Sequence, residues 1–250
     1  LKISLTRRTL LAGAGAAAGS LLVGWRPAAG ATPAAGTPAA EATLATWLRV
    51  NTDNTVTVYI GQAEMGQGVV TALAALVAED LGVTWEQVRA EMPDSAPQFR
   101  TKRGRRVTGN SDSVMSGFVP LRKAGAAARE MLTSAAAQRW NVAVAECVAA
   151  DGQVRHAPTG QSASYGELAA AAAVLPVPDS PALKPASAWQ LIGKPLPRKD
   201  VPEKVAGTAV FGVDVEFDGL QTATIMACPT FGGRLASVDP APALALPRLA

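Results

Sequence analysis

The chain has 250 residues, of which 48% are hydrophobic and 17% are charged, so it can bury a core and hold one large domain or two small ones. Its net charge of +3 is small and lies partly in the N-terminal segment, so it is weak evidence for an acidic partner and does not indicate nucleic acid. Two cysteines far apart in the sequence, Cys147 and Cys228, and a single histidine, His156, argue against a self-contained zinc or iron–sulfur site.

The N-terminal segment has the pattern of a secretory signal. Arg7 and Arg8 precede a Gly/Ala-rich apolar stretch that ends near Val23, and Ala29-Gly30-Ala31 has the small residues of a cleavage site. The stretch is too short to span a bilayer, and paired arginines indicate the route that exports folded proteins. We therefore expect residues 1–31 to be a twin-arginine signal peptide and the protein to be periplasmic.

The same segment could instead be an uncleaved membrane anchor, and the protein could lie peripherally at the inner membrane. Because this export route usually carries proteins that received a cofactor before translocation, the signal favours a cofactor-bearing enzyme. Leu1 stands where a start methionine is expected, which indicates a non-standard start or an incomplete gene sequence.

The sequence after residue 31 predicts a linker, a hairpin and a helix. Residues 32–44 are rich in alanine and proline and are expected to form the linker. Alternating apolar residues on both sides of residues 52–55 predict two paired strands, the second of them over 56–60. The periodic run 69–81, followed by Gly82, predicts an amphipathic helix.

The turn Glu64-Met65-Gly66-Gln67-Gly68 joins that strand to that helix and is the strongest candidate site. Two glycines leave no Cβ atoms to keep a ligand away, and the unpaired N–H groups at the start of a helix attract anions. Gln67 adds an amide that can both donate and accept. The turn is a candidate cradle for a phosphate or a polar cofactor ring; a tight turn with a solvated Gln67 is the alternative.

Two shorter signals follow the helix. Thr84 and Gln87 have the spacing of a capping box and predict another short helix. The loop 100–106 carries five basic residues. It is either solvated or in contact with a cofactor phosphate or an acidic partner subunit.

A polar loop, Thr108-Gly109-Asn110-Ser111-Asp112-Ser113, precedes a helix that we expect from about Pro120 to Trp140. The apolar face of this helix has the spacing of a packed helix and consists of Leu121, Ala124, Ala128, Met131 and Ala135. The loop is a second loop-before-helix site, and it could converge with the first on one ligand. Ordinary turn and cap chemistry is the alternative.

The rest of the chain divides near residue 186. Asp151-Gly152 lies between two short strand patterns and predicts a second hairpin, with His156 at its end as a surface residue rather than a catalyst. Ser164 and Glu167 have the spacing of a capping box before an alanine-rich helix. After a proline-rich connector, residues 192–219 have the composition of turns and strands rather than helices.

Four stretches together resemble the molybdenum-binding subunit of the xanthine oxidase family. They are EMGQGVVTALAALVAEDLGV, TGNSDSV with the helix LRKAGAAAREMLTSAAAQRW, YGELA, and IGKPLPRKDVPEKVAGTAVFGVDV. The type most similar is the exported beta subunit of isoquinoline 1-oxidoreductase and related periplasmic aldehyde dehydrogenases. The resemblance covers about residues 44–250. Since the chain stops just after a strand pattern that resembles the hammerhead domain, we expect it to be the N-terminal third of a longer protein.

The resemblance implies an α+β fold with two parts. Residues 45–185 would be a partial molybdopterin-binding domain, with mixed strands and helices. Residues 186–250 would be the start of an α/β hammerhead domain, placed after the GQG turn as in the isoquinoline type.

The resemblance also implies which residues touch the cofactor. Two groups would contact the pterin of molybdopterin, in its cytosine dinucleotide form: Met65, Gly66, Gln67 and Gly68 from the turn, and Thr108, Gly109, Ser111 and Ser113 from the polar loop. Asn110 stands where relatives often have a second glycine, which puts close backbone approach there in question.

In the family, the reaction oxidises an aldehyde or hydroxylates a carbon beside a ring nitrogen, with water as the oxygen source. Electrons leave through iron–sulfur clusters on a small partner subunit, and a cytochrome is a candidate acceptor. The base is a glutamate that the resemblance places beyond residue 250, so no catalytic residue is assigned and Glu64 is not put in its place. The alternative function is a non-enzymatic exported module for cofactor binding or assembly.

Overall fold

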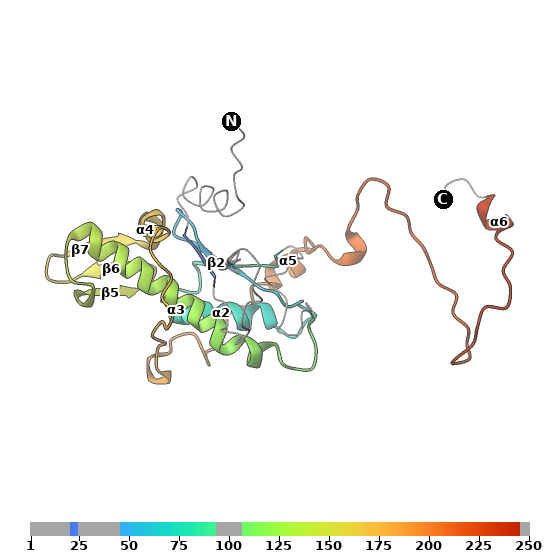
Figure 1. Ribbon diagram of the computed structural model, residues 1–250, viewed down its shortest axis with the longest axis horizontal. Coiled ribbons are helices and arrows are strands. Elements are labelled where there is room, and N and C mark those ends of the chain that lie inside the picture. Colours follow the sequence, from blue (N-terminus) through green and yellow to red (C-terminus); the bar gives the residue numbers. More distant parts are fainter. Residues whose placement is uncertain (1–20, 25–45, 94–106, 246–250) are drawn as a thin grey trace, which may run out of the picture. The chain divides into compact units, whose positions relative to one another are not determined.

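The computed structural model describes residues 21–24, 46–93 and 107–245 (Figure 1). Helices and small sheets alternate along this part of the chain, which confirms the α+β class. The described residues up to Gly207 belong to one compact unit and those from Thr208 to another, and each unit is described by itself. In the part of the chain that the structure describes, no helix is both long and apolar enough to cross a membrane.

The first sheet contains the predicted hairpin. It has four strands in the order β1 (Leu21–Gly24), β2 (Thr46–Val50), β3 (Val56–Tyr59) and β4 (Val88–Glu91). The pairs β1–β2 and β2–β3 are antiparallel, whereas β3 and β4 are parallel and are joined by α2 (Val69–Leu81). Alternation buries the apolar side of the hairpin fully, at Leu48, Val50, Val56 and Val58.

Strand β1 lies inside the segment expected to be a signal peptide. Its backbone pairs with β2, so these four residues extend the sheet at one edge. Arg7, Arg8, the cleavage site and the linker 32–44 lie outside the described residues. The signal peptide therefore stays a prediction.

Helix α2 has the predicted bounds and ends at Gly82, whose φ of 78° is left-handed. The predicted helix after it is wrong. The side chain of Gln87 accepts from Thr84 N at 2.9 Å, which is half of a capping box, but the chain then enters β4. Because Val88 already pairs with Val56 of β3, the residues between Gly82 and Val88 are too few for a helix.

Helix α3 (Ser113–Trp140) packs along α2, and Figure 1 shows the two helices side by side. Its predicted apolar face is buried at all five positions. The predicted start near Pro120 is wrong, because the helix begins seven residues earlier and Pro120 lies inside it. Close packing of α3 on α2 accompanies the helical turns on both sides of Pro120. A Cβ on Gly117 would lie 3.1 Å from Leu73, and one on Gly125 would overlap the carbonyl oxygen of Val77.

The second sheet has three antiparallel strands, β5 (Cys147–Ala150), β6 (Gln153–His156) and β7 (Gln161–Ser164), and follows the short 3-10 helix η2 (Val144–Glu146). Asp151 and Gly152 make the predicted two-residue turn, with φ values of 52° and 72°. The expected surface position of His156 is wrong. Alternation along β6 turns it inward, where Nδ1 lies 2.8 Å from Thr159 Oγ1 and Nε2 lies 3.4 Å from Glu146 Oε2.

The predicted capping box is confirmed at α4 (Tyr165–Ala172). Ser164 Oγ accepts from Glu167 N at 3.2 Å, and the Glu167 carboxylate accepts from Ser164 N at 2.7 Å. Buried Tyr165 at the start of this helix donates to Leu81 O, which ties α4 to the end of α2.

Residues 184–200, here called the strap, follow α4 and include the 3-10 helix η3 (Ala186–Ala188). Turns and strands rather than helices were expected over 192–219; turns are present, but the region has no strand and contains α5 (Val201–Ala206) and the 3-10 helix η4 (Gly212–Asp214). Asp200 before Pro202, and Gly207 after the helix, are start and stop signals that outweigh the strand pattern. Toward the C-terminus lies α6 (Ala241–Leu244). Residues 186–207 belong to the first compact unit, and a hammerhead-like domain over 186–250 stays a prediction.

Candidate functional site

The turn before α2 is capped by the chain's own carboxylate. Glu64 Oε1 accepts from Gly66 N at 2.9 Å and from Gly68 N at 2.8 Å, while Oε2 accepts from Val70 N at 3.1 Å. Burial raises the pKa of Glu64, but these three N–H donors outweigh it and hold the pKa below its ordinary value. A phosphate at these N–H groups would have to displace Glu64, whereas a polar ring beside the turn would not.

Gln67 takes part in the geometry of the same turn. Its Oε1 accepts from Met65 N at 2.6 Å, and its Nε2 donates to Ala63 O at 3.0 Å. An amide oxygen can accept twice and an amide nitrogen can donate twice, so the described residues leave one acceptor position and one N–H hydrogen of Gln67 for a ligand. Gln67 is therefore neither a freely solvated side chain nor one used up by the turn.

The backbone of the turn is open at Gly66, whereas a Cβ on Gly68 would lie 3.9 Å from the Arg198 guanidinium carbon. Gly66 and Gly68 have φ values of 101° and 80°, which lie in a backbone region that residues other than glycine avoid. A Cβ on Gly66 would meet nothing within 4 Å, and Met65 is 69% exposed. A flat group can thus approach the backbone of this turn directly.

The structure brings the polar loop to this turn. The Thr108 hydroxyl accepts from Ala63 N at 2.7 Å, although the two residues are far apart in the sequence. Beyond it, a Cβ on Gly109 would contact Val107 alone, at 3.9 Å. The two loops are therefore adjacent, and their convergence on one ligand stays a prediction.

The rest of the polar loop has an unusual backbone. Asn110 and Ser111 have φ values of 56° and 53°, so Asn110 adopts the left-handed conformation that a glycine would adopt there. Exposed Ser111 and half-buried Ser113 continue the loop, and Ser113 is the first residue of α3. The basic loop 100–106 lies outside the described residues.

A hollow of about 370 Å³ lies beside the turn, between α2, α3 and the strap. Gly68 and Arg198 border it at the turn, and its walls are mainly apolar, including Leu76, Phe118, Leu191 and Leu196. Neither the strap nor Arg198 was expected near the turn from the sequence. The run Arg198-Lys199-Asp200 next to a helix start is the signal that marks the residue, but it does not say what the residue contacts.

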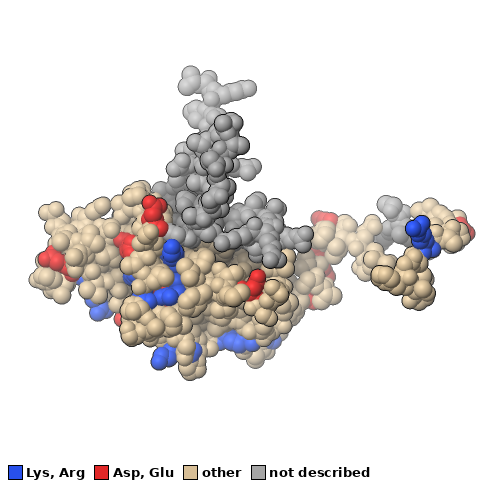
Figure 2. All heavy atoms as spheres, turned by 60° about the horizontal axis from the view of Figure 1, so that its bottom comes forward, with Lys and Arg blue, Asp and Glu red and all other residues tan. Residues whose placement is uncertain are grey.

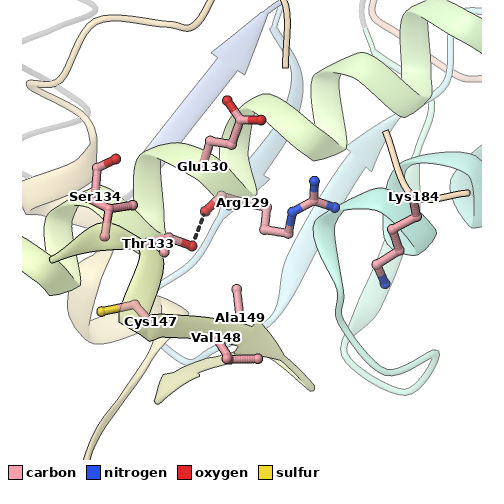
Figure 3. Close-up of a pocket in the computed structure, with 9 residues that line it drawn as sticks. Arg129, Glu130, Thr133, Ser134, Cys147, Val148, Ala149 and Lys184 are labelled. Atoms are coloured by element: carbon pink, nitrogen blue, oxygen red, sulfur yellow. Dashed lines mark hydrogen bonds between the residues drawn. The ribbon is translucent and has the colours of Figure 1, made fainter. Parts of the chain in front are cut away.

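A larger, open hollow of about 520 Å³ lies between α3, β5 and Lys184 (Figure 3). Its cations already have partners: Arg129 donates to Asp80 O and Ala182 O, and Lys184 Nζ lies 3.4 Å from Glu79 Oε1. Burial raises the pKa of the Cys147 thiol, which makes the thiolate less available. This hollow does not have the chemistry of an active site.

Charge and metal-binding groups add little to the site. On the face shown in Figure 2, blue and red side chains are scattered over a mostly uncharged surface, and neither sign dominates. Among residues 21–24, 46–93 and 107–245, no group of three His, Cys, Asp or Glu side chains could hold a metal ion.

Comparison with known proteins identifies a family that matches most of this chain. The pattern that defines the molybdopterin cofactor-binding domain matches residues 7–226. The chain belongs to the molybdopterin cofactor-binding domain family. This result confirms the resemblance to the molybdenum-binding subunits.

Three relatives of the family are similar over most of this chain. The beta subunit of isoquinoline 1-oxidoreductase from Brevundimonas diminuta is 33% identical over 98% of the chain. A membrane-bound aldehyde dehydrogenase from Gluconacetobacter polyoxogenes, whose name also carries pyrroloquinoline quinone, is 34% identical over 77% of it. A nicotinate dehydrogenase subunit from Pseudomonas putida is 30% identical over 76% of it. The chain spans 36%, 25% and 16% of the lengths of these relatives, in the same order.

The residues of the site fit a pterin better than a bare phosphate. A pterin edge presents neighbouring donors and acceptors, which match the remaining hydrogen-bonding positions on Gln67, and its flat face suits the open backbone at Gly66. The helix start that would bind a phosphate is filled by Glu64. When bound, molybdopterin would supply the redox chemistry, and these residues would hold and orient it.

Proposed function

We propose that this chain is the cofactor-holding part of a molybdenum hydroxylase subunit. The whole protein would oxidise an aldehyde or hydroxylate a carbon next to the nitrogen of a heteroaromatic ring, with water as the oxygen source. Electrons would pass to iron–sulfur clusters on a small partner subunit. Membership of the family and the names of the three relatives support this assignment.

One observation carries the proposal. The bond from Ala63 N to the Thr108 hydroxyl holds the GQG turn against the polar loop, so two separate backbone segments lie beside each other. Met65, Gly66, Gln67 and Gly68 would contact one part of the pterin, and Thr108, Gly109, Ser111 and Ser113 another. Such a two-sided contact needs no ionisable group, which suits a neutral ring.

Cofactor form and location extend the proposal. The cytosine dinucleotide form of molybdopterin is proposed because the residues resemble bacterial, exported members of the family. Periplasmic location through the twin-arginine route is proposed from Arg7 and Arg8.

The test is to purify the full-length protein from its natural host, together with whatever co-purifies, and to extract its cofactor. We expect molybdenum and a pterin in equal amounts, cytosine nucleotide on acid hydrolysis, and an iron-containing small subunit. Pyrroloquinoline quinone in place of the pterin would contradict the proposal. Pterin without turnover of any aldehyde or N-heterocycle would favour the non-enzymatic module.

A further inference from the structure

The strap lies along α2 from the end of the helix back to its start, and buried carboxylates on α2 fix its first half. Glu79 Oε2 accepts from the backbone N–H groups of Gln190, Leu191 and Ile192 at 2.8, 2.7 and 3.1 Å. Asp80 Oδ1 accepts from Lys184 N at 2.7 Å. Both carboxylates are almost completely buried, so this half of the strap is fixed to the core.

The second half of the strap is fixed to the first turns of α2 and to the loop after it. Lys199 N donates to Thr71 Oγ1 at 3.0 Å, and Trp85 Nε1 donates to Pro197 O at 2.9 Å. Lys199 Nζ donates to Trp85 O at 2.6 Å and lies 4.3 Å from the centre of the Trp85 ring. These contacts hold Arg198 at the turn before α2.

Arg198 makes contact with both the side chain and the backbone of that turn. Its Nη1 donates to Gly66 O at 3.0 Å, and its Nη2 lies 3.3 Å from Glu64 Oε1. Asp200 holds the guanidinium from the other side, at 3.0 Å from Nε and 2.7 Å from Nη2. Bonding to Arg198 holds the pKa of Asp200 far below its ordinary range, and the two side chains form an ion pair.

We propose that Arg198 is a positioning residue for the cofactor: by joining the strap to Glu64 and Gly66, it fixes the shape in which the turn presents Gln67. The identity of the ligand in this inference rests on the proposed function. The contact between Arg198 and the turn is independent of the proposed function.

The shape of the guanidinium explains why arginine is needed. Its planar fork donates in several fixed directions at once, so it can bind Asp200, Glu64 and the Gly66 carbonyl together. A lysine ammonium at the same place carries the charge but lacks the fork. Without Arg198, Glu64 could still cap α2, but Gly66 O would be left to water and the glycines of the turn would be freer to move.

The experiment compares Arg198→Met and Arg198→Lys with two controls in the full-length holoprotein. Lys199→Met loosens the adjacent residue of the strap without touching the turn, and Lys204→Met removes the exposed cation that binds Asp200 Oδ2 at 2.6 Å. Three quantities are measured: the rate of pterin and molybdenum loss on dialysis, the thermal midpoint, and hydrogen exchange of the amides at 65–70 with and without cofactor.

We expect Arg198→Met to lose cofactor about tenfold faster than the unaltered protein, which corresponds to one or two lost charge-assisted hydrogen bonds. Amides 65–70 should exchange faster in the cofactor-free protein as well. Arg198→Lys should have a higher thermal midpoint than Arg198→Met, but its amides at 65–70 should still exchange faster than those of the unaltered protein. The two controls should keep cofactor retention and exchange at the unaltered level, even if their midpoints fall.

Two results would overturn the inference. One is cofactor loss in Arg198→Met that is no faster than in Lys199→Met at the same fall in midpoint, which would make the role merely structural. The other is unchanged exchange at 65–70. A protein that holds no pterin even without substitution would contradict the proposed function instead, and the exchange data would still decide whether Arg198 holds the turn.

Discussion

The segments 46–93 and 107–207, taken together, differ from residues 208–245 in what happens to their apolar side chains. In the first region, apolar residues of α2, α3, α4 and both sheets share one buried core. In the second, the large apolar side chains are exposed, for example Ile225 at 91% and Met226 at 99%. The second region also forms no strand among its described residues.

The difference teaches that an apolar pattern produces structure only where a complementary surface is available. Helix α2 has α3 on one side and the hairpin on another, so its apolar residues are covered. The alternating residues Val213, Val215 and Phe217 have the same kind of signal, but no strand of the described chain pairs with them. The two regions should therefore respond very differently to substitution.

The largest effect is expected at the contact between α2 and α3. Gly125→Ala would place a methyl group against Val77 O, 3.0 Å from Leu81 N, and backbone atoms of two packed helices cannot move aside cheaply. We expect the free energy of unfolding to fall by about 3 kcal/mol or more. Denaturant unfolding measures it, with Gly212→Ala as the control, since a Cβ there meets nothing within 4 Å. Equal effects at the two positions would contradict the packing described.

Truncation of large apolar side chains gives the next largest contrast. Leu73→Ala opens a cavity at a residue that is 1% exposed, so a loss of about 2–5 kcal/mol is expected. Ile225→Ala removes an exposed side chain and should change stability by about 0.5 kcal/mol or less. The measurement is again denaturant unfolding, and a large loss at Ile225 would show that residues 208–245 are packed in solution.

A pH effect is expected from the buried carboxylate that holds the strap. Burial raises the pKa of Glu79, but the N–H groups of Leu191, Ile192 and Gln190 and the Lys184 ammonium together hold it below its ordinary value of 4.5. A lowered pKa stabilises the folded protein at pH values above 4.5, and this stabilisation is lost as the pH falls from 4.5 through the folded value. The thermal midpoint should drop over this range.

The matched variant for this effect is Glu79→Gln, whose amide oxygen can still accept from the same N–H groups. Its midpoint should be lower at pH 7 and should depend less on pH below the ordinary pKa of 4.5. If the thermal midpoint of Glu79→Gln falls with pH as steeply as that of the unaltered protein, other carboxylates cause the effect.

The smallest effect is expected at the exposed turn. Gln67→Ala removes two hydrogen bonds near solvent, so we expect a loss of about 1 kcal/mol or less, whereas Glu64→Gln weakens three bonds at the helix start and should cost more. Denaturant unfolding of the cofactor-free protein checks the order of the two. A reversed order would mean that Gln67, not Glu64, holds the turn.

Local signals in the sequence determined several elements of this protein. The bounds of α2 follow from its apolar period and from Gly82, and the tight turn at Asp151-Gly152 fixes the register of its hairpin. The capping box of Ser164 and Glu167 starts α4 as expected. In each case the interacting residues lie within a few positions of one another, so the pattern contains the whole interaction.

Tertiary structure decided the rest, because the deciding contacts join residues far apart in the chain. Packing on α2 sets the start of α3, and pairing with β3 turns the chain after Gln87 into a strand. The candidate site shows the same division: the GQG turn and the polar loop could be found in the sequence by their glycines and hydroxyls. The bond of Ala63 to Thr108 and the contact of Glu64 with Arg198 span tens of residues or more, and no local pattern specifies which distant partner a buried or charged group will meet.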